Sequence, residues 1–220
     1  MVSNLTNVME DYKDLYEGLR NKVVAITDLT LPFSQLVAQK LVEHRVQLVL
    51  GTTNAHNEFV AEMEGQFKPN VLPVYYAKES PIEVNRFFRQ TEKYFDRPPA
   101  IVLYEFNVPQ IPASRENDKE VYAFEHTVKP YLRIAETASE HIRESGIQDG
   151  RVIIITPQAD PRVLSLDEEL MLASSLKTRE LLQRRFGEVG INFLNFIRGY
   201  QSPEGQVDDL ILNYMINGKL

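Results

Sequence analysis

The sequence contains no cysteine, and this absence excludes several kinds of site at once. Without cysteine a chain has no disulfide, no thiolate metal site and no thiol nucleophile. Its histidines are His44, His56, His126 and His141, which lack the close spacing of metal ligands. We therefore expect no metal site, and the composition agrees with a cytoplasmic protein.

Positive charge is also scarce, because 24 Lys and Arg face 31 Asp and Glu, which leaves a formal charge of −7. An acidic chain attracts neither the phosphate backbone of nucleic acid nor an anionic membrane surface. No apolar run approaches the roughly 18 residues of a membrane-spanning helix, and the first twenty residues lack the apolar core of a signal peptide. We expect a cytoplasmic protein that binds neither nucleic acid nor membranes.

Short apolar runs rich in Val, Ile, Phe and Tyr alternate with amphipathic segments along the chain. This alternation is typical of βαβ units around a parallel sheet with helices on both faces. The predicted strands are residues 23–27, 47–50, 71–76, 101–104, 152–156 and 191–197. The predicted helices are residues 33–44, 54–67, 81–95, 118–145 and 167–186. The sequence therefore predicts one doubly wound, Rossmann-like α/β domain over residues 19–220, after an N-terminal extension of residues 1–18.

Two of the predicted helices carry further expectations. Helix 118–145 contains Pro130, which lacks the backbone N–H of an interior helical residue and is predicted to kink or interrupt the helix. Helix 167–186 carries apolar residues mainly on one side, and this stripe is predicted to face something apolar. That stripe consists of Leu170, Ala173, Leu176, Leu181 and Leu182.

Three motifs resemble the short-chain dehydrogenase/reductase family over nearly the whole chain. LRNKVVAIT at residues 19–27 is similar to the entry to that family's first strand, and GRVIIIT at residues 150–156 to the strand before its catalytic serine. GINFLNFIRG at residues 190–199 has the spacing of the family motif Gly-Ile-x-Val-Asn-x-Ile-x-Pro-Gly. The resemblance implies the family's dinucleotide-binding fold.

The glycine-rich turn that binds the cofactor pyrophosphate in that family is replaced here. Its three glycine positions are taken by Asp28, Pro32 and Ser34. A carboxylate, a ring without an N–H and a side chain then stand where backbone amides would approach phosphate. We expect no dinucleotide bound by this chain. Asp28 or Thr30 is expected to cap the following helix and Pro32 to occupy its first turn.

The family's catalytic pair is missing as well, since no Tyr-x-x-x-Lys occurs in the sequence. A phenol acts as general acid there because a lysine one helical turn later lowers its pKa. The family's tyrosine position falls on Glu168, Leu172 or Ala173, depending on the gap, and its serine position on Thr156 or Pro157. Lys177 is at best a doubtful remnant of the lysine. We therefore expect no catalytic residue.

Two other places depart from the family's pattern. The asparagine motif expected at residues 103–107 retains only Asn107, out of register, and the supporting asparagine expected at residues 127–130 is absent. After the sixth strand only SPEGQ at residues 202–206 and a short helical pattern precede the closing segment. The sequence predicts a shortened lid and C-terminus.

The chain keeps the strands and helices of the fold but lacks the cofactor-binding and catalytic residues of its loops. This combination suggests selection for shape and contact surface. The resemblance implies assembly through the two long helices, residues 118–145 and 167–186. Our first hypothesis is a non-catalytic subunit of a heterodimer or heterotetramer, whose catalytically intact short-chain dehydrogenase partner binds NAD. Such degenerate partners are known in this family. One resembling case is the heteromeric alcohol dehydrogenase of anaerobic toluene degradation, which oxidises a benzylsuccinyl-type coenzyme A thioester.

Two alternatives stay open. An active reductase with unorthodox residues would use Thr156, Glu168 or Lys177 for proton transfer and would tolerate Asp28 and Pro32 beside phosphate. A homo-oligomeric regulatory protein would bind another small molecule in the crevice at the carboxyl edge of the sheet.

Overall fold

The computed structural model describes residues 17–54, 57–107, 111–157 and 166–198, together with Ile211 and Met215. Its centre is a six-stranded parallel sheet in the order β3-β2-β1-β4-β5-β6. The strands are β1 Val23–Ile26, β2 Gln47–Thr52, β3 Val71–Tyr75, β4 Ile101–Glu105, β5 Gly150–Pro157 and β6 Ile191–Arg198. All six predicted strands are present, and the doubly wound Rossmann-like fold is confirmed.

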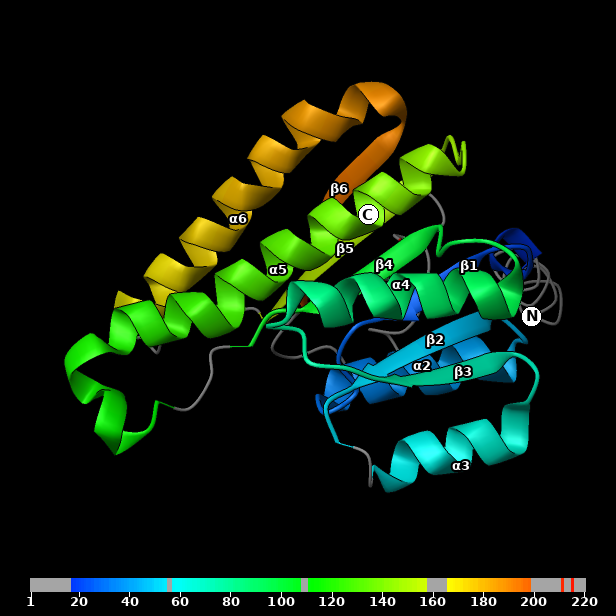
Figure 1. Ribbon diagram of the computed structural model, residues 1–220, viewed down its shortest axis with the longest axis horizontal. Helices are drawn as coiled ribbons and strands as arrows, with labels where there is room; N and C mark the ends of the chain where they lie inside the picture. The colour runs from blue at the N-terminus through cyan, green and yellow to red at the C-terminus, as the bar shows by residue number, and fades with distance from the viewer. Residues whose placement is uncertain are drawn as a thin grey trace, which may run out of the picture.

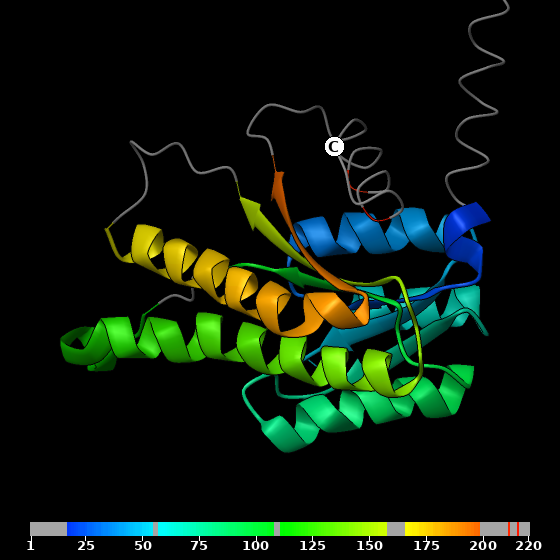
Figure 2. The same cartoon turned by 90° about the horizontal axis from the view of Figure 1, so that it is seen from above.

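The helices lie on both faces of this sheet (Figures 1 and 2). They are α2 Pro32–Glu43, α3 Glu58–Phe67, α4 Pro81–Phe95, α5 Lys119–Glu144 and α6 Leu166–Phe186, with short 3-10 helices η1 Ala113–Asp118 and η2 Gly187–Val189. Figure 2 shows α2 on one side of the sheet and α4 and α5 on the other. None of the helices in the described ranges is both long and apolar enough to cross a bilayer.

Each face of the sheet has its own hydrophobic core. On β1, Val24 and Ile26 pack with α2 and α3, whereas Val23 and Ala25 pack with α4 and α5. Successive side chains of a strand point to opposite faces, so a strand covered by helices on both sides must be apolar throughout. This is why the strands stand out in the sequence as continuous apolar runs.

Helix boundaries follow local capping chemistry. The Asn57 side chain accepts a hydrogen bond from the Val60 N–H at 3.2 Å, and α3 begins at Glu58, four residues later than predicted. Ser80 caps α4 in the same way, through the Glu83 N–H at 3.4 Å. The start of α4 agrees with the prediction because Ser80 followed by Pro81 is a strong helix-start pattern.

The predicted interruption of α5 at Pro130 was wrong, because the helix continues through this buried residue. A kink at Pro130 stays a prediction. One missing backbone bond is a small loss for a helix of 26 residues that packs along its length on the sheet.

The predicted apolar stripe of α6 is divided between the core and the surface, because Leu182 is buried whereas other members are exposed. Leu181 is 54% exposed and Leu170 is 48% exposed, and Ala173 is exposed too. The residues of α6 that are buried are Met171, Ser175, Leu182 and Phe186. Their spacing of four, seven and four residues is helical, and Leu182 is the one residue that they share with the predicted stripe.

Both ends of the described chain touch the core on the α2 side. Leu19, Ile211 and Met215 are fully buried there. The guanidinium of Arg151 on β5 donates a hydrogen bond to the Met215 carbonyl at 2.5 Å. The predicted lid and most of the N-terminal extension and C-terminal segment lie outside the described residues.

Candidate functional site: the crevice at the carboxyl edge of the sheet

The strand order places a crevice between the carboxyl ends of β1 and β4. The chain proceeds from β1 through β2 to β3 on one side, and from β4 through β5 to β6 on the other. Ligands of open parallel sheets bind where the strand order reverses, outside the carboxyl ends of the strands. Asp28 and Ser34 follow β1, and Glu105 ends β4, so these residues border that crevice.

A carboxylate of the protein lies at the N-terminus of α2. Glu105 Oε2 accepts a hydrogen bond from the Ser34 backbone N–H at 3.0 Å and another from the Ser34 hydroxyl at 2.7 Å. Free N–H groups and the helix dipole make this end of a helix an anion-binding site. In this chain the anion is Glu105, at the place where a dinucleotide fold holds pyrophosphate.

The predicted cap of α2 was therefore half right. Pro32 occupies the first turn, as expected, but the N-cap residue is Leu31, and it makes no side-chain capping bond. Neither Asp28 nor Thr30 caps the helix. Glu105, 71 residues further along the chain, satisfies the Ser34 amide instead.

Asp28 is the centre of a second set of polar contacts at the same edge of the sheet. Its carboxylate accepts hydrogen bonds from the backbone N–H of Thr30 at 3.0 Å and from the Thr30 hydroxyl at 2.5 Å. The ammonium group of Lys78, which follows β3, lies 2.6 Å from the other carboxylate oxygen. The side chains of Asp28 and Lys78 are only 8% and 19% exposed. This largely desolvated ion pair joins the loop after β1 to the loop after β3.

Two buried phenols support the floor of the crevice. Tyr76 donates to the Thr27 carbonyl at 2.8 Å, and Tyr104 donates to the Thr127 carbonyl at 2.9 Å. Burial raises the pKa of both phenols, and the nearby charge of Asp28 raises it further. A phenol that acts as general acid needs a lowered pKa. Tyr76 and Tyr104 are therefore structural donors that stay protonated.

The closest approach in this floor is at Gly51 on β2. A Cβ atom there would lie 2.7 Å from both the Thr27 carbonyl oxygen and Cε1 of Tyr76. The N–H of Leu29 also donates to the Gly51 carbonyl at 2.9 Å. Loop and strand are thus in direct backbone contact, with no room for a side chain between them.

Replacing Glu105 tests how far α2 depends on this carboxylate. Glu105→Ala is expected to lower the free energy of unfolding by about 1–3 kcal/mol, since a buried helix-terminal amide loses a charged acceptor. Glu105→Gln keeps an acceptor oxygen and should cost less. Urea unfolding followed by circular dichroism measures both, and equal losses for the two variants would contradict a role for the acceptor.

The remaining predicted site positions are not part of this network. Thr156 is 2% exposed and donates to Asn195 Oδ1 at 3.2 Å and more weakly to the Phe196 carbonyl at 3.5 Å, both on β6. Lys177 lies more than two turns into α6, where it is exposed and pairs with Glu180 at 2.8 Å. Within the described ranges, neither Thr156 nor Lys177 forms a hydrogen bond or ion pair with Asp28.

The alternative positions for the family's serine and tyrosine lie on β5 and α6. Pro157 ends β5, and Glu168 lies in the first turn of α6. Leu172 is half-buried against the core on the α5 side, and Ala173 is exposed. That the chain has no catalytic residue stays a prediction.

Sequence reasoning missed Glu105, Lys78 and Tyr76. Glu105 had a detectable signal, because it is a carboxylate directly after the buried run IVLY. A charge at the carboxyl end of a buried strand reaches the ligand edge of such a sheet. Lys78 and Tyr76 had none, because their partners lie 50 and 49 residues away in the chain.

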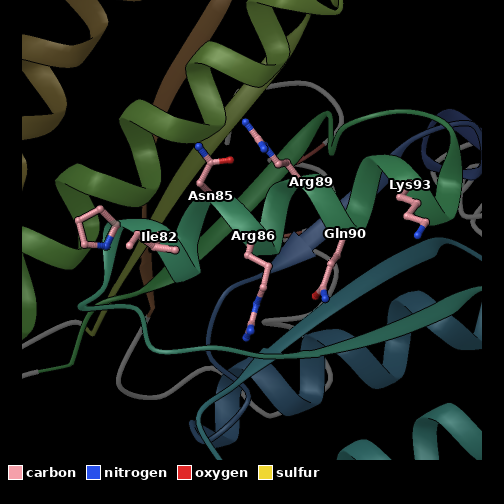
Figure 3. Close-up of a pocket in the computed structure, with 7 residues that line it drawn as sticks. Ile82, Asn85, Arg86, Arg89, Gln90 and Lys93 are labelled. Carbon is pink, nitrogen blue, oxygen red and sulfur yellow. The ribbon is translucent and has the colours of Figure 1, made fainter.

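A hollow of about 640 Å³ lies on the outer surface of α4 and was not anticipated either (Figure 3). Its walls include Arg86, Arg89 and Lys93, and Ile82 near its end is 79% exposed. In Figure 3, Arg86 and Gln90 point to one side of the helix. The hollow follows the helix surface and is separate from the crevice.

Comparison with known proteins places the fold but not the activity. No family model and no curated protein matches the sequence. Among solved structures, a short-chain type dehydrogenase/reductase from Mycobacterium marinum superposes with a TM-score of 0.77 over 92% of this chain and 90% of its own, at 14% identity. The fold is that of the short-chain dehydrogenases/reductases.

Two further structures with this fold were solved with a nucleotide. NADH-dependent reductase A1-R', complexed with NAD, gives a TM-score of 0.74 at 13% identity over 92% of each chain. The 3-ketoacyl-(acyl-carrier-protein) reductase of Brucella melitensis, complexed with NADH, gives 0.65 at 15% identity over 83% of this chain and 77% of its own. At such identities the likeness extends to the fold alone.

Proposed function

We propose that this protein is a non-catalytic subunit of a hetero-oligomeric, NAD-dependent short-chain alcohol dehydrogenase in the cytoplasm. Its partner supplies the nicotinamide site and the Tyr-x-x-x-Lys pair, and this chain supplies contact surface and stability. By resemblance, the proposed substrate class is a 2-(hydroxyalkyl)succinyl or 2-(hydroxybenzyl)succinyl coenzyme A thioester, oxidised in the partner's site.

The observation that carries this proposal is the position of Glu105. Its carboxylate holds the Ser34 amide at the N-terminus of α2, the group that a cofactor phosphate would need. A phosphate brought to the same place would meet this carboxylate, and two like charges at close range repel each other. The absence of NAD binding stays a prediction, and this geometry supports it.

The partner surface is proposed on α5 and α6, which lie side by side along one flank of the molecule (Figures 1 and 2). Four large apolar side chains are exposed there. They are Val121 at 56% and Phe124 at 39% on α5, and Leu170 at 48% and Leu181 at 54% on α6. Exposed apolar residues gathered on neighbouring elements mark interaction sites. The first turns of α5 also extend beyond the sheet in both views.

The deciding experiment is the native mass and composition of the tagged protein purified from its own host. A stoichiometric complex with a dehydrogenase that retains the glycine-rich loop and Tyr-x-x-x-Lys is the expected result. A protein recovered alone, or only as a homo-oligomer, sinks the proposal. Titration with NADH, followed by its fluorescence, then separates an active reductase, which binds it, from a regulatory protein that binds another ligand.

Substitutions in this chain should leave the chemistry of the complex intact. Thr156→Ala and Lys177→Ala are each expected to change kcat by less than about twofold, whereas loss of a general acid costs about 100-fold or more. The matched positive control is Tyr→Phe at the partner's catalytic tyrosine, assayed in the same complex. A 100-fold loss from either substitution in this chain would show that it takes part in catalysis.

A further inference from the structure

Three buried polar atoms have no hydrogen-bond partner within the described part of the chain, and all three belong to α5 or α6. They are the Tyr131 hydroxyl on α5, and the Ser175 hydroxyl and Arg179 Nε on α6. Tyr131 and Ser175 are 0% exposed. Folded proteins pair nearly all such groups, because a buried donor without an acceptor has lost its hydrogen bonds to water and gained none in the protein. Three of them on one pair of helices need a specific cause.

The three groups face the same seam. Ser175 and Arg179 are one helical turn apart and therefore lie on one face of α6. That face also carries Met171 and Leu182, which share a hydrophobic cluster with Tyr131. The charge of Arg179 acts on the Tyr131 phenol, where it opposes the rise in pKa that burial causes. Arg179 thus lies near Tyr131 as a half-buried residue whose Nε atom is buried.

No acceptor in the described ranges lies within hydrogen-bond distance of these atoms. Each of the three groups can donate a hydrogen bond, the two hydroxyls can also accept one, and Arg179 carries a guanidinium group. Two acids close to the seam are already engaged. Glu180 pairs with Lys177, and Glu136 pairs with Arg185, both at 2.8 Å. No ion pair is formed by Arg179 in the described ranges.

We propose that the seam between α5 and α6 is an anion site, in which a carboxylate or a small oxyanion accepts hydrogen bonds from Tyr131, Ser175 and Arg179. The same chemistry fits a free small molecule and an acidic side chain of a subunit seated on these helices. The site adjoins the floor of the crevice, because the Tyr131 ring lies 5.3 Å from that of Tyr104. It does not depend on the proposed role in a dehydrogenase complex.

Thermal unfolding of the full-length chain tests the site. Sodium phosphate and sodium acetate are compared with sodium chloride at equal ionic strength, in order to remove general screening. At saturation, phosphate or acetate should raise Tm by about 5 °C or more, as expected for a ligand at roughly 100 times its Kd. Arg179→Met should abolish this shift. Arg184→Met removes an exposed arginine of the same helix and should keep it.

The hydroxyl variants should change two measured quantities in opposite directions, the Tm without added anion and the anion-dependent rise in Tm. Tyr131→Phe and Ser175→Ala each remove an unpaired buried donor, so each should raise Tm without added anion and reduce the anion-dependent shift. A general salting effect stabilises all variants alike. Equal shifts in the wild type and in Arg179→Met would overturn the proposal, and so would a phosphate shift that is unaffected by both hydroxyl variants.

Comparing the isolated chain with the complex purified from the host identifies the source of the acceptor. A phosphate shift that is present in the isolated chain and absent in the complex assigns the acceptor to a partner's acidic side chain. A shift present in both assigns it to a free small molecule. Because the first comparison needs no partner, a failure of the proposed function leaves the anion site standing, and the reverse also holds.

Discussion

Leu181→Glu is expected to weaken assembly with the proposed partner by about 100-fold or more, because an unpaired charge in an apolar contact costs roughly 3 kcal/mol or more. Leu181 is 54% exposed on α6 and contributes little to the core, so the isolated variant should fold as the wild type does. Analytical ultracentrifugation of the mixed subunits measures the affinity, and circular dichroism checks the fold.

Ile82→Glu is the matched control for that experiment. Ile82 is an even more exposed apolar residue, at 79%, but it lies on α4, at the hollow shown in Figure 3. The same charge placed there should leave assembly unchanged. Weaker assembly with Ile82→Glu and normal assembly with Leu181→Glu would move the partner surface from α5 and α6 to α4.

Phe87→Ala is expected to produce the largest loss of stability, about 3–5 kcal/mol, as for other buried phenylalanines cut to alanine. Phe87 is 1% exposed, and its ring lies 4.7 Å from that of Tyr76 and 5.2 Å from that of Phe88. The substitution therefore opens a cavity and also releases Tyr76, which holds the Thr27 carbonyl under the crevice. Tm should fall by roughly 10 °C or more.

Tyr94→Ala on the same helix separates this effect from helix propensity. Tyr94 is 42% exposed and contacts Phe95 edge to face at 4.8 Å. Its removal should cost about 1 kcal/mol or less. If both variants lost the same amount in thermal unfolding, packing under the crevice would not be the reason that Phe87 matters.

The fold could be predicted from the sequence because its signals are local. Strands buried on both faces appear as unbroken runs such as VVAI and VIII, and the Ser80-Pro81 pair marks the start of α4. Arg179 shows where this kind of inference fails. A charged residue is assigned to the outside of a helix by its chemistry, and only the packing of α6 against α5 reveals that Arg179 is half-buried, with its Nε atom shielded from solvent.

The sequence predicted which phosphate-binding residues are missing from the crevice. It did not predict which side chains take their place. That Asp28, Pro32 and Ser34 are poor residues for holding phosphate follows from their chemistry alone. That Glu105 then binds Ser34, and Lys78 binds Asp28, depends on contacts between residues 71 and 50 positions apart. A single sequence holds no signal for such pairs, because each partner alone reads as an ordinary polar residue after a strand.

The bond between Glu105 and Ser34 has a consequence for the motion of the loop after β1. In a protein whose loop becomes ordered only on ligand binding, part of the binding free energy is used to order that loop. Here the ordering is completed when β4 joins β1 during folding. The loop should therefore exchange its amide hydrogens slowly in the isolated chain, and at the same rate whether or not nucleotide is added.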